Sequence, residues 1–437
     1  MRESEQLIPE RQDLQPQNPQ SQNPQSQNRA TLHRRRVYRR RRIAVAVAAL
    51  LVLGIGFYLP LTLLAPVQAI APEVQQPAGI AATPPPVTFP GYGASGVGAV
   101  GYPGVLASAG ATEPLPIASI SKIITALVVL DAKPLAPGEA GPTLTFGSID
   151  EDFYFAQRAI GGVTKPVRSG QVMSQRNVMD VMLMASANNY AETLATWAFG
   201  SEAAFADAAR VWLDREGLAS TTIEEPTGVS PNNASTVADL VEIARRATSN
   251  PVIAEIVATQ TLDVAGVGVV DNRNGLLGVD GIDGIKTGTL DAAGACLLFS
   301  QDVAVGAETI TVVGVVLGGP DHATINAAIR SLLAEVDAGF REVTLTTDGT
   351  EYASFETAWG DTATAVATQT ATTVLWGATP VTASLDVDDV ALAPAGSAVG
   401  EVTFTAGDRV ITVPLELSAE IDDPGPWWRL TNPAALL

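Results

Sequence analysis

Ser119 and Lys122 stand three residues apart at the head of the apolar stretch A-S-I-S-K-I-I-T-A-L-V-V-L, residues 118–130. On a helix, positions i and i+3 share a face, so this spacing brings a hydroxyl and an amine together, whereas Ser121 is expected to point elsewhere. A serine nucleophile needs a base, and a lysine serves when burial lowers its pKa. The pair therefore predicts nucleophilic catalysis, with Ser119 as nucleophile and Lys122 as base.

Lysine is scarce in this chain. Of its 26 basic residues only four are lysines, namely Lys122, Lys133, Lys165 and Lys286. Arginine stays charged in any protein environment, whereas a buried lysine can lose its proton. Lys133 and Lys165 each precede a proline in a polar loop, and we assign them no role. Lys122, inside an apolar stretch, indicates a need for an amine that can be deprotonated.

The chain has one cysteine, Cys296, and two histidines, His33 and His322. A single cysteine excludes an intramolecular disulfide and a cysteine-based metal site. With one histidine outside the N-terminal tail we predict neither a metal nor a cofactor. A Ser-His-Asp triad would have to use His322.

Two further polar motifs follow. The first is Ser186-Ala187-Asn188, which interrupts the apolar pattern of residues 175–199 and by itself fits a helix junction equally well. The second follows a glycine-rich segment and consists of Lys286, Thr287, Gly288 and Thr289. The motifs S-x-x-K, S-x-N and K-T-G thus occur in that order, 67 and 100 residues apart.

Helical and strand patterns mix over residues 91–340. Residues 175–199 form one helix or two joined near Ser186, with Ser174 as N-cap. The other predicted helices cover residues 119–131, 202–216, 236–248 and 323–338, and the predicted strands cover 96–109, 260–271, 294–300 and 309–317. Strands at both ends with helices between them predict an α+β fold, in which helical layers cover a sheet.

Residues 341–437 alternate apolar and polar side chains at period two and contain turn signals such as D-G and A-G-D. This pattern predicts a separate, small, all-β C-terminal domain.

The N-terminal region has three parts. Residues 1–42 are rich in Gln, Asn and Pro and then in Arg, and are expected to be a disordered cytoplasmic tail. Residues 43–65 carry no charge and are long enough to span a bilayer, and the arginines before them place the N-terminus inside. We expect an uncleaved signal anchor; the alternative is a signal peptide cleaved after V-Q-A, residues 67–69. Residues 66–90, rich in Pro and Ala, are expected to be an extended spacer.

The net charge of -20 is unevenly distributed, because residues 1–42 carry a net charge of +6. The body of the chain is therefore strongly acidic, which argues against nucleic acid as a partner.

The three motifs resemble those of the serine D-alanyl-D-alanine carboxypeptidases, the low-molecular-mass penicillin-binding proteins. The stretches P-T-G-V-S-P-N-N-A-S-T at 226–236 and N-R-N-G-L-L-G-V-D-G-I-D-G-I-K-T-G at 272–288 look like those of this family. The resemblance covers everything after the spacer and implies a penicillin-binding-protein/β-lactamase-like sheet followed by a β domain.

The resemblance also implies a reaction. Ser119 would attack the carbonyl between the two terminal D-alanines of a peptidoglycan stem peptide, Lys122 would take its proton, and Ser186 would relay a proton to the leaving D-alanine. The backbone N–H groups of Ser119 and Thr289 would form the oxyanion hole. Water would then release the shortened peptide, and β-lactams would acylate Ser119 as covalent inhibitors.

The remaining motif residues would bind substrate. Asn188 would bond the peptide backbone and touch Lys122, Lys286 would supply positive charge, and Thr287, beside Gly288, would bind the terminal carboxylate. Together these predictions describe a single-pass protein of the cytoplasmic membrane with its catalytic domain outside.

Three alternatives remain open. A DD-endopeptidase has nearly the same sequence pattern. A serine β-lactamase needs a glutamate that activates water, yet no E-x-x-L-N pattern follows Glu224 and Glu225. A cell-wall-binding protein without activity would not need intact motifs.

Overall fold

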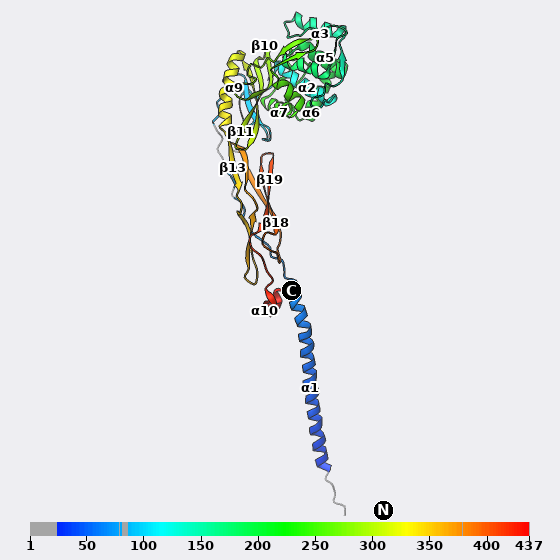
Figure 1. The fold of residues 1–437 in the computed structure, drawn as a ribbon, viewed down its shortest axis with the longest axis vertical. Helices are drawn as coiled ribbons and strands as arrows, with labels where there is room; N and C mark the ends of the chain where they lie inside the picture. Colours follow the sequence, from blue (N-terminus) through cyan, green and yellow to red (C-terminus); the bar gives the residue numbers. More distant parts are fainter. Residues whose placement is uncertain (1–23, 78, 81–85, 378, 437) are drawn as a thin grey trace, which may run out of the picture.

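The computed structural model describes residues 24–77, 79–80, 86–377 and 379–436. The molecule is elongated, with a long helix at one end, an α+β unit at the other and a β-rich region between them (Figure 1). The N-terminal part of the predicted disordered tail, residues 1–23, lies outside the described residues.

A five-stranded antiparallel sheet forms the centre of the α+β unit, in the order β10-β11-β12-β2-β3. Its strands are β2 (Ala94–Ala99), β3 (Ala107–Gly110), β10 (Ile282–Leu290), β11 (Gly294–Val305) and β12 (Glu308–Gly319). The strands of this sheet come from the two ends of the unit. All its helices except the last lie between β3 and β10 in the sequence.

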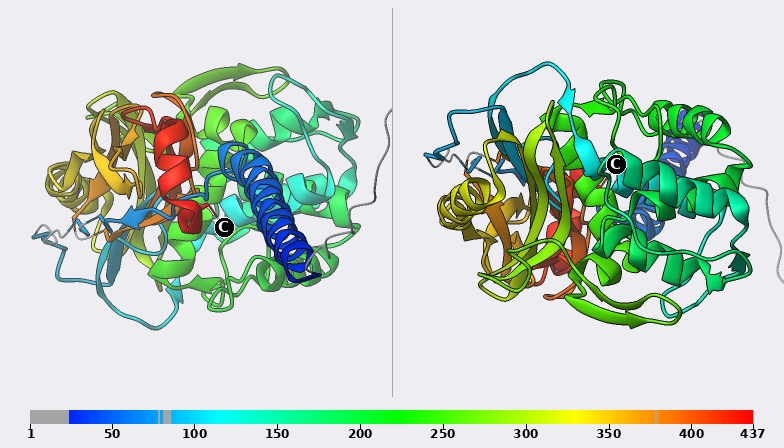
Figure 2. Two further views of the ribbon diagram at one scale, coloured as in Figure 1. Left: turned by 90° about the horizontal axis from the view of Figure 1, so that it is seen from below. Right: turned by 90° about the horizontal axis from the view of Figure 1, so that it is seen from above.

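Helices cover both faces of this sheet, which confirms the predicted α+β fold. Helix α9 (His322–Asp337) packs on one face, and the remaining helices gather on the other (Figure 2). These are α2 (Ser121–Ala132), α3 (Ser148–Ala159), α4 (Gln175–Met184), α5 (Asn188–Phe199), α6 (Glu202–Arg215), α7 (Val237–Ser249) and α8 (Pro251–Ala258), with a 3-10 turn, η1 (Ala118–Ile120), before α2. Three small two-stranded antiparallel sheets pair β4 (Leu115–Pro116) with β7 (Ala234–Ser235), β5 (Thr143–Thr145) with β6 (Val172–Ser174), and β8 (Thr261–Val264) with β9 (Gly268–Asp271).

The helical stretch 175–199 is two helices, α4 and α5, that meet at residues 185–187. The Ser174 hydroxyl accepts a hydrogen bond from the backbone N–H of Asn177, which confirms Ser174 as the N-cap. Between the helices Ser186 adopts a left-handed conformation, with φ of 61°. Such strain in a non-glycine residue persists only where the surrounding structure holds it, and often marks a functional position.

A six-stranded sheet, in the order β1-β14-β15-β19-β18-β17, forms the C-terminal region beside the pair β13–β16, and confirms the predicted all-β domain. The strands are β13 (Phe340–Thr346), β14 (Glu351–Glu356), β15 (Thr362–Ala367), β16 (Ala371–Trp376), β17 (Val381–Val387), β18 (Ala398–Ala406) and β19 (Arg409–Leu417). The core of the first sheet continues into this region. Tyr102 donates a hydrogen bond to the Val374 carbonyl at 2.6 Å and packs edge-on against Phe340.

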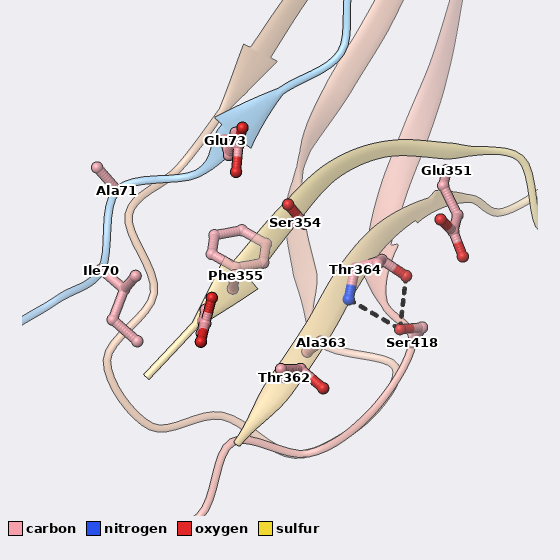
Figure 3. A pocket seen from close by; sticks show the side chains of 11 residues that line it. Ile70, Ala71, Glu73, Glu351, Ser354, Phe355, Thr362, Ala363, Thr364 and Ser418 are labelled. Atoms are coloured by element: carbon pink, nitrogen blue, oxygen red, sulfur yellow. Dashed lines mark hydrogen bonds between the residues drawn. The ribbon is translucent and has the colours of Figure 1, made fainter. Parts of the chain in front are cut away.

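Parts of residues 66–90, predicted to be an extended spacer, pair with the C-terminal sheet. Strand β1 (Glu73–Val74) pairs with β14, and Ile70 and Ile80 form bridges to Val390 and Val381. Figure 3 shows this strand lying beside β14 at a cavity of about 520 Å³. Composition alone predicted an extended chain, and an extended chain can add to an exposed sheet edge.

Helix α1 (Pro24–Leu63) also differs from the prediction, because it begins within the expected disordered tail. Arginine has a high helix propensity, so the basic segment extends the helix that the apolar residues form. Residues 37–63 are long and apolar enough to cross a membrane. Near the C-terminal end of α1, Tyr58 donates a hydrogen bond to the Leu430 carbonyl at 2.6 Å, within the C-terminal helix α10 (Gly425–Thr431). A short 3-10 turn, η2 (Pro433–Ala435), follows α10.

Candidate active site

Ser119 lies in the turn η1, two residues before α2, and Lys122 lies in the first turn of that helix. The Lys122 amine is 3.0 Å from the Ser119 hydroxyl oxygen, as the i, i+3 spacing predicts. Ser121 points elsewhere, because its hydroxyl donates to the Ala118 carbonyl and accepts from the Asn233 amide. The structure therefore selects Ser119 as the partner of Lys122.

Lys122 is fully buried and has two further acceptors, Asn188 Oδ1 at 2.8 Å and the Thr227 carbonyl at 2.5 Å. Burial lowers the Lys122 pKa to about 7, against the opposing charges of Glu225 and Glu192 and with the help of Arg273. A neutral amine has two hydrogens and one lone pair. When the hydrogens bind the two carbonyl oxygens, the lone pair faces the Ser119 hydroxyl.

Glu225 holds the loop that carries Thr227. Its carboxylate accepts hydrogen bonds from the backbone N–H groups of Thr227 and Gly228, both at 2.7 Å, and from the Ser230 N–H at 3.2 Å. This cluster places the Thr227 carbonyl on Lys122. The glutamate is therefore committed to loop structure.

The K-T-G motif lies on β10, the edge strand next to η1. A Cβ atom on Gly288 would lie 3.0 Å from the Ile117 carbonyl oxygen and 3.2 Å from the Ala118 Cβ. Glycine at this position thus lets the strand approach the turn that carries Ser119. Lys286 is buried, and its pKa lies well below its usual range because of burial and then the charges of Lys122 and Arg273.

Two cavities meet at Ser119. The larger, about 500 Å³, is lined by Asn188, Gly228, Thr289 and Asp291 among others. The smaller, about 300 Å³, is lined by Ser186, Arg273, Thr287, Gly288, Thr289 and His322 among others. Because Ser119 and Thr289 line both cavities, a substrate in the two would pass over the nucleophile.

Arg273 and His322 were not predicted as binding residues, yet both line the smaller cavity. His322 Nε2 is 2.7 Å from the Thr289 hydroxyl, at the edge of the sheet. Burial lowers the His322 pKa, and the charges of Arg273 and Lys286 lower it further. For Arg273, the sequence signal is its position in N-R-N-G-L-L, within the stretch 272–288 that resembles the family.

Solved structures share this fold. A peptidoglycan synthesis regulatory factor from Streptococcus pneumoniae aligns with a TM-score of 0.56 and 22% identity, covering 76% of this chain and 99% of that one. Penicillin binding protein 5 from Haemophilus influenzae aligns with a TM-score of 0.55 and 20% identity, covering 78% of this chain and 99% of that one. At these identities the likeness concerns the fold.

Two curated relatives match at higher identity. The D-alanyl-D-alanine endopeptidase of Escherichia coli strain K12 is 32% identical over 191 residues, which cover 42% of this chain and 58% of that protein. The protein of the same name from Pseudomonas aeruginosa is 34% identical over 151 residues, covering 35% of this chain and 46% of that protein. The chain thus matches about half the length of each.

A family model described as D-alanyl-D-alanine carboxypeptidase matches residues 103–320, which hold all three motifs and all the residues that line the site except those of α9. The resemblance inferred from the motifs is confirmed. Through these residues the chain belongs to the peptidase S11 family, the family of that description.

Proposed function

We propose that this protein is a serine D-Ala-D-Ala carboxypeptidase that removes the terminal D-alanine from peptidoglycan stem peptides. The observation that carries the proposal is the buried Lys122 amine, 3.0 Å from the Ser119 hydroxyl and with a pKa of about 7. A general base works best when its pKa lies near the working pH, and this lysine meets that condition.

Acylation begins when neutral Lys122 takes the proton of the Ser119 hydroxyl as its oxygen attacks the penultimate D-alanine carbonyl. The backbone N–H groups of Ser119 and Thr289 stabilise the oxyanion. When the C–N bond breaks, Ser186 relays a proton to the leaving amine. The acyl group stays on Ser119 until water attacks the ester and releases the shortened peptide.

The smaller cavity binds the leaving D-alanine. Thr287 and Arg273 offer a hydroxyl and a guanidinium to its carboxylate, and arginine suits planar carboxylates. Burial lowers the Lys286 pKa, so we assign the positive charge beside the carboxylate to Arg273 rather than to Lys286. Asn188 faces the larger cavity, where the stem peptide lies. A space of about 300 Å³ suits a small leaving group.

A DD-endopeptidase is the second candidate, because both curated relatives carry that name. Its leaving group is a cross-linked peptide, which has to extend out of the smaller cavity. A β-lactamase is disfavoured, because the Glu225 carboxylate is bonded to backbone N–H groups of its own loop and does not activate water.

The test uses the full chain in detergent with diacetyl-L-Lys-D-Ala-D-Ala and, separately, a cross-linked muropeptide dimer. We expect release of free D-alanine from the first, none from Ser119→Ala, and a lasting adduct of labelled penicillin on Ser119. Cleavage of the dimer alone would favour the endopeptidase. Rapid turnover of penicillin would favour the β-lactamase, and an inert wild-type chain that retains its fold would favour a cell-wall-binding protein.

We also propose that α1 anchors the protein in the cytoplasmic membrane, with the N-terminus inside and the catalytic unit in the cell envelope. The uncharged residues 43–63 of α1 and the seven arginines between residues 34 and 42 support this topology.

A further inference from the structure

The side-chain amide of Asn188 has two unlike ends, and only its oxygen can accept a hydrogen bond from Lys122. Asn188 Oδ1 lies 2.8 Å from the Lys122 amine. The reversed orientation would point an N–H group at the base. Something must therefore hold the amide in one orientation.

Gln157 and Glu192 provide that hold. Asn188 Nδ2 donates to Gln157 Oε1 at 2.7 Å, and Gln157 Nε2 donates to Glu192 Oε1 at 2.7 Å. The Lys122 amine donates to Asn188 Oδ1, which turns Asn188 Nδ2 toward Gln157 and in turn fixes the Gln157 amide. The series ends at a carboxyl, which offers an accepting oxygen to Gln157 whether it is ionised or protonated.

The series is closed off from solvent. Gln157, Asn188 and Glu192 are 5%, 3% and 7% exposed. Gly162 covers the central hydrogen bond, because a Cβ atom there would lie 2.6 Å from Gln157 Oε1 and 2.9 Å from Asn188 Nδ2. Water therefore cannot replace either partner, and a broken link leaves a buried polar group unpaired.

Glu192 is not explained by the stability of the fold alone. Its Oε2 atom is buried without a hydrogen-bond partner among the described residues, and burial raises its pKa to about 8. Burying a carboxyl with one unpaired oxygen costs free energy of folding, so stability alone does not account for Glu192. What it does here is end the hydrogen-bond series that leads to Lys122.

We propose that Gln157 and Glu192 are positioning residues of the acylation step, which hold the Asn188 carbonyl oxygen on Lys122 through two successive hydrogen bonds. The proposal rests on the proposed serine peptidase function. The same orientation leaves the second N–H of Asn188 free for a substrate carbonyl in the larger cavity, which Asn188 lines.

The first test measures the rate at which labelled penicillin acylates Ser119 in the full-length protein. Gln157→Leu removes both hydrogen bonds at nearly constant volume, and we expect a loss of roughly tenfold to a hundredfold. In the double variant Gln157→Glu, Glu192→Gln, the two groups exchange places and the series can form again. Recovery to within about threefold is expected, and a double variant as slow as Gln157→Leu would overturn the proposal.

The second test does not depend on activity. The chain has four lysines, so lysine labelled with ¹³C at Cε gives four signals to titrate by NMR. In Gln157→Leu the freed amide can turn an N–H toward the ammonium, so the Lys122 signal should titrate at lower pH than in the wild type. Lys133 and Lys165 serve as internal references. An unchanged Lys122 titration in a folded Gln157→Leu protein overturns the proposal, even if the wild type releases no D-alanine.

If Gln157→Leu does not fold, all four lysines titrate near the ordinary lysine value of about 10.4. The double variant then decides. Acylation by penicillin within about threefold of the wild-type rate supports the hydrogen-bond series, and a loss of tenfold or more overturns it.

Discussion

At the scale of residues, the site depends on a lysine that can lose its proton. Lys122→Arg keeps the charge and removes the base, because arginine does not deprotonate in proteins. We expect acylation by penicillin to fall roughly 10²- to 10⁴-fold, the usual contribution of general acid–base catalysis. The measurement is the acylation rate of the full chain, with circular dichroism as control for folding. Retained activity would rule out Lys122 as the base.

The pH dependence of acylation follows from the same residue. Burial lowers the Lys122 pKa to about 7, so the neutral form increases as the pH rises through that value. From pH 6 to pH 8 the neutral fraction rises from about one tenth to about nine tenths, and the acylation rate should rise about tenfold. Stopped-flow fluorescence with labelled penicillin measures it. A rate that falls over this interval would contradict a neutral lysine base.

The sequence predicted these residues to different extents. Ser119 and Lys122 follow from a spacing within one helical turn, which local geometry fixes. Gln157 and Glu192 are 35 residues apart and meet only because α3 packs on α5, so no local pattern reveals them. His322, at the start of α9, likewise meets Thr289 on β10 only in the folded structure, 33 residues away in the sequence.

At the scale of elements, the turn η1 is held from two sides. Strand β10 contacts it through Gly288, and the 225–233 loop contacts it through Gly228. The helical stretches that carry the first two motifs were predicted from periodicity. These close backbone contacts were not, because a glycine alone does not indicate its neighbour.

A glycine substitution tests the loop contact. Gly228 has φ of +85°, and a Cβ atom there would lie 2.0 Å from the Ala118 carbonyl oxygen. Gly228→Ala should displace the turn that carries Ser119 and slow acylation roughly a hundredfold, as a 1 Å misplacement does.

Gly170→Ala is the matched control, because Gly170 has φ of +83° and nothing within 4 Å of the added atom. It should carry the same backbone strain, about 1–2 kcal/mol, without loss of the acylation rate. Equal rates in the two variants would show that backbone strain alone explains the effect.

At the scale of the whole molecule, the linker that follows α1 pairs with the edge of the C-terminal sheet. The Gln75 N–H donates to the Tyr352 carbonyl at 2.8 Å beside β1. Gln75→Pro removes this donor and should speed thermolysin cleavage of the linker, without change in acylation. Gln76→Pro leaves the bond in place and should be cut like the wild type. Equal cleavage of both variants, measured by mass spectrometry of the full chain, would contradict a paired linker.

Composition predicted a spacer here because Pro-rich segments are usually extended and solvated. It could not reveal the pairing, because the partners of β1 in β14 lie about 280 residues away and the free edge exists only in the folded domain. The helical start of α1 was not predicted, because the tail is rich in Gln, Asn and Pro, a composition typical of disorder, whereas its arginines favour a helix.

The continuous core between the two sheets has a further consequence, because Tyr102, Phe340 and Trp376 join the catalytic unit to the β domain. A catalytic unit on a flexible tether samples a broad volume, which dilutes its encounters with any one target. With α1 in the membrane, as we propose, the packed β domain between α1 and the catalytic unit (Figure 1) would confine the site to a thin shell at one height. The effective concentration of enzyme is then high for stem peptides in that layer of the wall and negligible for those outside it.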